Sequence, residues 1–135
     1  MPTADIASDN CLLVMWWVGA MPQEAIDLVD AWGFRLVNMN GFVWNKLTKK
    51  GLPDFGMGFY TRAGAESAII AIKKKGKFSP KSRSVRSVIT AEKRKHSQKP
   101  IEIYERINEL AGDCAKLELF ARNTHEGFDC FGDEL

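Results

Sequence analysis

The sequence predicts an α/β domain, because β-prone stretches alternate with two stretches of helical pattern along its 135 residues. Each helical stretch begins at a proline and ends at a glycine, at Pro22–Gly33 and Pro100–Gly112. The length and a hydrophobic content of 45% fit a single domain, residues 1–135, with a core of its own. No internal repeat or domain boundary interrupts this pattern.

The first strand and helix are predicted at the start of the chain. Residues 11–18 form a continuous apolar run with β-branched and aromatic members, which is typical of a strand buried on both faces. Pro22 suits the first position of a helix, and Glu24 lies in the first turn, where an acid is favoured. The apolar stripe with helical spacing consists of Ala25, Leu28, Val29 and Trp32.

Two further strands are predicted on either side of a loop. Residues 34–46 read as a strand with a turn or bulge signal at Asn40-Gly41. The stretch 48–62 is polar and glycine-rich, so a loop is expected there. Residues 65–73 are rich in isoleucine, and the two strands flanking the loop are expected to pair antiparallel.

The remaining elements are a strand at 85–90, the second helix and a strand at 117–121. The second helix presents one apolar face, made of Ile103, Ile107 and Leu110. We expect residues 117–121 at the centre of one sheet, with the carboxyl end of the strand opening into a ligand crevice.

The net charge of +2 conceals a strong segregation of charge. Residues 73–99 contain eleven Lys or Arg residues and one acid, Glu92, so this basic segment carries +10 and the rest of the chain −8. Such a field attracts polyanions, and phosphate contacts supply affinity that does not depend on sequence. The alternative is a solvated basic loop without a ligand.

Composition also bears on compartment and metals. The longest apolar run, Cys11–Met21, is shorter than the roughly 20 residues that span a bilayer, and no basic leader precedes it. A cytoplasmic protein without membrane contact is therefore expected. The three cysteines are odd in number and lack C-x-x-C spacing, so they predict thiols in the core rather than disulfides or a zinc site. No metal is expected.

Several motifs occur in a characteristic order: the apolar strand 12–18, Phe42–Lys46, His-x-x-Lys-Pro at 96–100 and Lys-Leu-Glu-Leu-Phe-Ala-Arg at 116–122. With them the chain resembles the N6-adenine methyltransferases related to the messenger-RNA adenosine methyltransferase, in particular the phage and bacterial DNA-modifying branch. The resemblance implies a Rossmann-like sheet with helices on both faces, in a bacterial or phage-infected cell.

The resemblance implies S-adenosylmethionine as the cofactor. The cofactor-binding residues that it implies are Lys99, Glu118, Phe120, Arg122, Asn123, Thr124, His125, Gly132, Asp133 and Glu134. Lys99 would face the carboxylate of the cofactor, and Arg122 its ribose. Asp133 stands where the family usually has asparagine. Taken alone, Lys99 reads as an ordinary surface lysine, and Glu118 and Arg122 as a surface ion pair.

The resemblance also implies a substrate-binding set. Its members are Gly56, Gly58, Tyr60, Thr61, Arg62, Lys93, Arg94 and Lys95. The two glycines permit close backbone approach, and Phe59 and Tyr60 could stack a base. Without the resemblance, this stretch reads equally as a simple connector whose aromatic residues enter the core. Glu66 follows at the position of a family acid, and Trp16 or Trp17 is a candidate for the pocket wall.

The family carries out catalysis with an Asp-Pro-Pro-Trp tetrad, and these 135 residues contain no such sequence. Catalytic residues are therefore unassigned, and an N-terminally truncated, mis-started or degenerate chain is expected, with a missing upstream segment or a dimer partner. The predicted function is N6-adenine methylation of nucleic acid, DNA more than RNA. The alternative is a non-catalytic nucleic-acid-binding or pairing module.

Overall fold

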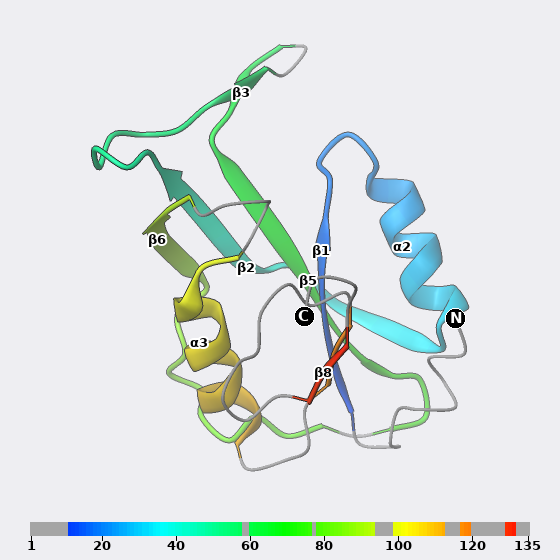
Figure 1. Ribbon diagram of the computed structural model, residues 1–135. Helices are drawn as coiled ribbons and strands as arrows, with labels where there is room; N and C mark the ends of the chain where they lie inside the picture. The colour runs from blue at the N-terminus through cyan, green and yellow to red at the C-terminus, as the bar shows by residue number, and fades with distance from the viewer. Residues whose placement is uncertain are drawn as a thin grey trace. The chain divides into compact units, whose positions relative to one another are not determined.

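The computed structural model describes residues 11–57, 60–76, 78–93, 99–112, 117–119 and 129–131. The chain forms two compact units, one of residues Met1–Ser79 and Arg86–Glu92 and one of Pro80–Val85 and Lys93–Leu135. The first unit contains β1 (Leu12–Trp17), α2 (Pro22–Ala31), β2 (Phe34–Leu47), β3 (Gly56–Met57), β4 (Arg62–Ala63), β5 (Ala65–Lys73) and β6 (Val88–Glu92). The second contains α3 (Ile101–Ala111), β7 (Leu117–Leu119) and β8 (Asp129–Phe131) (Figure 1).

A four-stranded mixed sheet in the order β1-β5-β2-β6 is the framework of the first unit. β5 pairs antiparallel with both β1 and β2, whereas β2 and β6 run parallel. The antiparallel pairing of the two strands that flank residues 48–62 confirms the prediction from sequence. β1 lies at one end of this order and is half-buried at every position, so the expectation of a strand buried on both faces is wrong.

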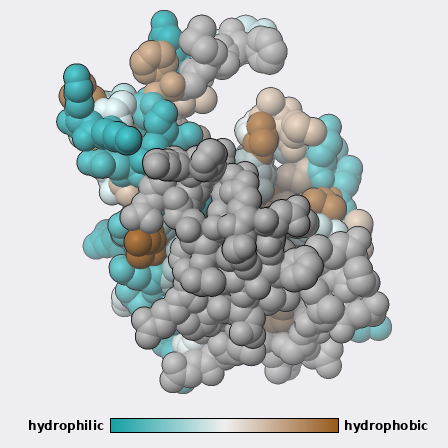
Figure 2. Space-filling view, in the orientation of Figure 1, coloured by the Kyte–Doolittle hydropathy of each residue, from teal (hydrophilic) through white to brown (hydrophobic). Residues whose placement is uncertain are grey.

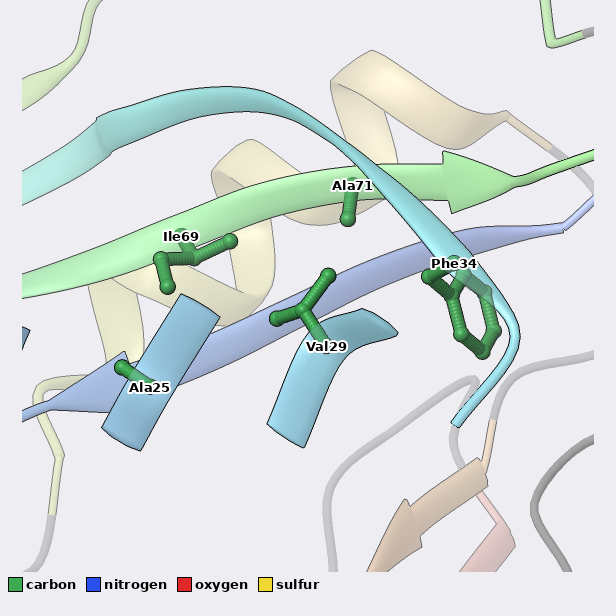
Figure 3. Close-up of a cluster of buried hydrophobic side chains, with 5 residues drawn as sticks. All are labelled: Ala25, Val29, Phe34, Ile69 and Ala71. Atoms are coloured by element: carbon green, nitrogen blue, oxygen red, sulfur yellow. The ribbon is translucent and has the colours of Figure 1, made fainter. Parts of the chain in front are cut away.

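Helix α2 covers one face of this sheet. Pro22 stands in its first turn, and the chain leaves through Gly33 with φ of 86°, as the sequence predicts. Ala25 and Val29 point from the helix toward β5, where they form a core with Phe34, Ile69 and Ala71 (Figure 3). Burying a side chain the size of valine contributes about 1.5–3 kcal/mol, so this stripe holds the helix on the sheet.

One member of the predicted stripe does not join this core. Leu28 is 40% exposed, although Trp32 packs against the cluster as expected. Trp17 also packs there, and its indole N–H donates a hydrogen bond to the carbonyl of Met39 at 2.8 Å. The sequence pattern predicts a wider apolar stripe than the contact with β5 requires.

The opposite face of the sheet is buried in its middle. Phe42 and Trp44 of β2 and Ile89 of β6 are each 1% exposed. The indole N–H of Trp44 donates to the carbonyl of Ala91 at 3.0 Å, so its one polar atom is satisfied. The sequence predicts that most of the tryptophans lie in the core, and this is confirmed for Trp44.

The interruption predicted at Asn40-Gly41 is present as irregular pairing of β2 between Leu36 and Phe42. At Gly41 an added Cβ would overlap Cγ1 of Ile70. Glycine is required here because the side chain of Ile70 crosses directly over the strand.

In the second unit, α3 follows Pro100, and its capping residue Gly112 has φ of 73°. Ile103 is buried, whereas Ile107 and Leu110 are half-buried. The backbone N–H of Lys81 donates to the carbonyl of Leu110 at 2.8 Å, and its side-chain stem lies against Gly112. A lysine at this end of the helix complements the helix dipole.

Strand β7 pairs in parallel with β8 in a two-stranded sheet of its own. For the described residues, the expectation that 117–121 lies at the centre of one sheet is therefore wrong. Neither helix in the described ranges is long and apolar enough to cross a membrane.

Candidate nucleic-acid and cofactor site

The predicted substrate segment forms a structured projection in place of the expected loop. Residues 48–63, here called the arm, leave the end of β2 and return at the start of β5 (Figure 1). Within the arm, β3 and β4 pair antiparallel, with Gly56 opposite Ala63 and Met57 opposite Arg62. The prediction of a loop over 48–62 is corrected to a turn followed by a short hairpin.

Three backbone contacts fix the base of the arm. The N–H of Lys46 donates to the carbonyl of Gly64, and the carbonyl of Lys46 accepts from the N–H of Asp54, both at 3.0 Å. Leu47 and Pro53 form an isolated β-bridge. A Cβ on Gly64 would lie 2.8 Å from the carbonyl oxygen of Asp54, so only glycine permits this close approach.

The predicted substrate residues described in the arm are exposed. Tyr60 is 100% exposed, and Thr61 and Arg62 are also on the surface. The Arg62 guanidinium lies over the ring of Phe55, 4.8 Å from the ring centroid, and Phe55 is itself 58% exposed. Tyr60 therefore does not enter the core, whereas Phe59, the other aromatic residue predicted to stack a base, lies outside the described residues.

An ion pair lies on the sheet beside the arm. The Nζ atom of Lys46 is 3.1 Å from Oε2 of Glu66, and it also lies 5.5 Å from the centroid of the Trp44 ring. The side chains of Lys46 and Glu66 are 21% and 30% exposed. Such a partly exposed pair contributes at most about 1 kcal/mol to stability, so its main effect is to fix the position of the Lys46 side chain next to the arm.

Two lysines of the basic segment have structural roles. The Nζ atom of Lys74 is 2.6 Å from Oδ1 of Asp30, an ion pair between the end of β5 and α2. Lys81 lies against the end of α3. Lys93, a predicted substrate contact, is exposed, whereas Arg94 and Lys95 lie outside the described residues.

The predicted cofactor residues are described only in part. Lys99 is half-buried directly before α3, and Glu118 lies in β7. Helix α3 begins without a side-chain hydrogen bond to its first turn, so its leading N–H groups and the helix dipole favour an anion. The other predicted members lie outside the described residues: Phe120, Arg122, Asn123, Thr124, His125, Gly132, Asp133 and Glu134, as does Gly58 of the substrate set.

A hollow of about 380 Å³ lies between α2 and β2. Its lining is largely apolar: Ile26, Val29, Asp30, Phe34, Arg35, Leu36 and Lys74. None of these residues belongs to the predicted cofactor or substrate sets, so the hollow lends those sets no support. The sequence analysis included Phe55 in the candidate segment but gave neither Phe55 nor Lys46 a role, because their contacts depend on how β2, the arm and β5 align.

Comparison with known proteins agrees with the resemblance. The family model described as MT-A70 matches residues 1–134. The type II methyltransferase M.MunI of Mycoplasma sp is 33% identical over 132 residues, which are 96% of this chain and 53% of that protein. A putative N(6)-adenosine-methyltransferase MT-A70-like protein of Medicago truncatula is 27% identical over 128 residues, 92% of this chain and 20% of that protein.

The solved structure of the M1.HpyAVI–SAM complex is similar to this chain, with a TM-score of 0.68 at 18% identity, over 98% of this chain and 72% of that one. At this identity the similarity establishes the fold, which is a Rossmann-like methyltransferase fold. The chain spans about half the length of M.MunI and a fifth of the plant protein. Because the family model covers nearly the whole sequence, the chain belongs to the MT-A70 family.

Proposed function

We propose that this chain forms the substrate-binding and cofactor-binding part of an S-adenosylmethionine-dependent N6-adenine methyltransferase that acts on nucleic acid. The observation that carries the proposal is the family match over residues 1–134, with relatives named as a type II methyltransferase and as N(6)-adenosine-methyltransferases. DNA is proposed over RNA because the type II methyltransferase is the more similar of the two kinds, at 33% against 27% identity.

The described residues fit the carboxylate end of the cofactor. Lys99 contributes an ammonium group just before α3, and the first turn of α3 offers N–H groups without a side-chain cap. Both features favour a bound carboxylate, each by about 0.3–1 kcal/mol at an exposed site. When bound, S-adenosylmethionine supplies an electrophilic methyl group on its sulfonium. The role of this chain's residues is then to hold the cofactor and the target base in place.

The arm provides the base-contacting side of the proposal. An adenine amine within a duplex is inaccessible, so an enzyme of this kind extrudes the base and stacks it against aromatic or apolar side chains. Tyr60 offers a fully exposed ring for such a contact, and Arg62 a cation for a neighbouring phosphate. Lys93 adds a further exposed cation beyond β6.

A second candidate function is a non-catalytic nucleic-acid-binding or pairing module. It is favoured by one sequence fact: the 135 residues contain no Asp-Pro-Pro-Trp. Positioning of two reactants contributes up to about 7–11 kcal/mol of barrier lowering, so without the groups that orient the amine, turnover would fall by orders of magnitude.

A labelled methyl-transfer assay on adenine-containing DNA and RNA separates the two. It compares the chain with a version extended upstream by an Asp-Pro-Pro-Trp segment, and we expect turnover by the extended version only. Calorimetry with S-adenosylmethionine tests the cofactor part. Lys99→Met is expected to weaken cofactor binding, whereas Lys50→Met, a matched removal of one lysine in the arm, is expected to leave it unchanged. Binding that is indifferent to Lys99→Met would contradict the assignment.

A further inference from the structure

The arm carries surface features besides the predicted substrate residues. It begins with a tight turn in which the Thr48 hydroxyl accepts hydrogen bonds from the N–H groups of Lys50 and Leu52, both at 3.3 Å. The N–H of Thr48 in turn donates to the carbonyl of Leu52 at 2.8 Å, and Gly51 takes φ of 77°. The turn is therefore held in shape by its own backbone and the threonine.

This turn presents two adjacent cations, Lys49 and Lys50, which are both exposed. In the part of the chain that the structure describes, neither has a carboxylate within ion-pair distance. The arm as a whole contains three basic residues and one acid, Asp54. In Figure 2 the projecting region on the upper left is mostly hydrophilic, with small hydrophobic spots within it. Uncompensated cations on a rigid turn suit a phosphate-bearing partner.

Large apolar side chains are exposed on the same arm. Leu52 is 60% exposed, Phe55 58% and Tyr60 100%. Single exposed apolar residues are common, but three within nine positions of a projecting arm form a concentrated apolar surface. One face of the Phe55 ring is occupied by the Arg62 guanidinium, an arrangement that extends the flat surface on which a base could stack.

We propose that the arm binds the unpaired nucleotides next to the target adenine, with Phe55 as a stacking surface for a base and Lys49 and Lys50 as phosphate contacts. Cations and exposed rings interleaved on one structured element match the two components of single-stranded nucleic-acid recognition, backbone charge and base π-faces. The inference rests on the proposed nucleic-acid substrate, and it adds to that proposal the residues that contact the nucleotides next to the target adenine.

Fluorescence anisotropy with a labelled single-stranded DNA oligonucleotide, and with an abasic strand of the same length, tests the stacking role. Phe55→Ala is expected to weaken binding of the base-bearing strand by about 5- to 150-fold and to leave abasic binding unchanged. Phe55→Leu keeps apolar surface without a ring and should weaken binding to the same extent. Val37→Ala, at a residue 55% exposed on β2, is the matched control and should have no effect.

The phosphate role is tested by the salt dependence of the same binding. Lys49→Gln and Lys50→Gln should each flatten the slope of log K against log salt by about 0.7, the value for one contact to a single strand. Arg35→Gln, which removes one exposed cation outside both the arm and the basic segment, should leave the slope unchanged. Unchanged urea midpoints would show that the variants are folded.

Three results would overturn the inference. The first is that Phe55→Ala weakens the binding of base-bearing and abasic strands equally. The second is that the salt slopes of both lysine variants are unaltered. The third is that an arm variant differs from the unmodified chain in oligomeric state in sedimentation, which would make the arm a contact between copies. The proposed function is tested independently. If DNA binding depended on the arm but the extended version transferred no methyl group, only the enzyme proposal would be contradicted. If the extended version transferred methyl groups but DNA binding did not depend on the arm, only this inference would be contradicted.

Discussion

The close approach at the base of the arm leads to a prediction about Gly64→Ala. A Cβ at this position would lie 2.8 Å from the carbonyl oxygen of Asp54, a distance that side-chain carbons essentially never adopt. The obstacle is backbone, so it cannot rotate away as a side chain would. We therefore expect the strands at the base of the arm to separate by several tenths of an ångström.

The separation should weaken two backbone hydrogen bonds, from Lys46 to Gly64 and from Asp54 to Lys46, each 3.0 Å long. A single hydrogen bond contributes a net of about 0.5–1.5 kcal/mol, so removal of both should lower the local stability of the arm by about 1–3 kcal/mol. In amide hydrogen exchange, the N–H groups of Lys46 and Asp54 should then exchange about 5- to 150-fold faster. The displaced arm should also bind single-stranded DNA more weakly.

Gly19→Ala is the matched control, because a Cβ at Gly19 would meet no atom within 4 Å. Its exchange rates and DNA affinity should equal those of the unmodified chain. If Gly64→Ala left the exchange of both amides within twofold of the original, the argument that glycine is required at the arm's base would be refuted.

Three further predictions concern the sheet and the charge. Gly41→Ala should lower the free energy of unfolding in urea by about 1–3 kcal/mol through its clash with Ile70, and in the Ile70→Ala background it should cost less than about 0.5 kcal/mol. If Gly41→Ala lowered the free energy of unfolding by the same amount with and without Ile70→Ala, the clash would be contradicted. Trp44→Phe should cost about 1–3 kcal/mol in the same measurement, since it leaves a cavity and removes the hydrogen bond from the indole N–H to the carbonyl of Ala91. Charge reversal of residues 93–95 should flatten the salt slope of DNA binding by about 0.9 for each phosphate that these residues bind, and an unaltered slope would exclude phosphate binding there.

Local sequence signals were sufficient for the helices. Pro22 and Gly33 bound α2, and Pro100 and Gly112 bound α3, because each residue's allowed backbone conformations suit one end of a helix wherever it lies in the fold. The antiparallel pairing across the arm was also predictable, since consecutive strands usually lie side by side and no helical pattern for a parallel crossover separates these two.

The candidate site was predictable only in outline. The glycines and aromatic residues of the arm marked a segment that could approach a base, and the motifs marked Lys99 and the strand at 117–119. The contact of Arg62 with Phe55 and the ion pair of Lys46 with Glu66 were not predictable. Both depend on registers between strands, and a shift of one residue would turn each side chain to the opposite face.

By itself, the sequence determined the two helices with their ends, most of the longer strands, the segregation of charge and, through its motifs, membership of the MT-A70 family. Only the tertiary structure decided that β1 pairs with β5, that Leu28 stays exposed, and that β7 pairs with β8 in a separate sheet. The physical reason is the separation along the chain of the residues that interact. Helix ends follow from conformational preferences of neighbouring residues, whereas strand partners and burial follow from contacts between segments far apart in the chain, each of which can form only when the others do.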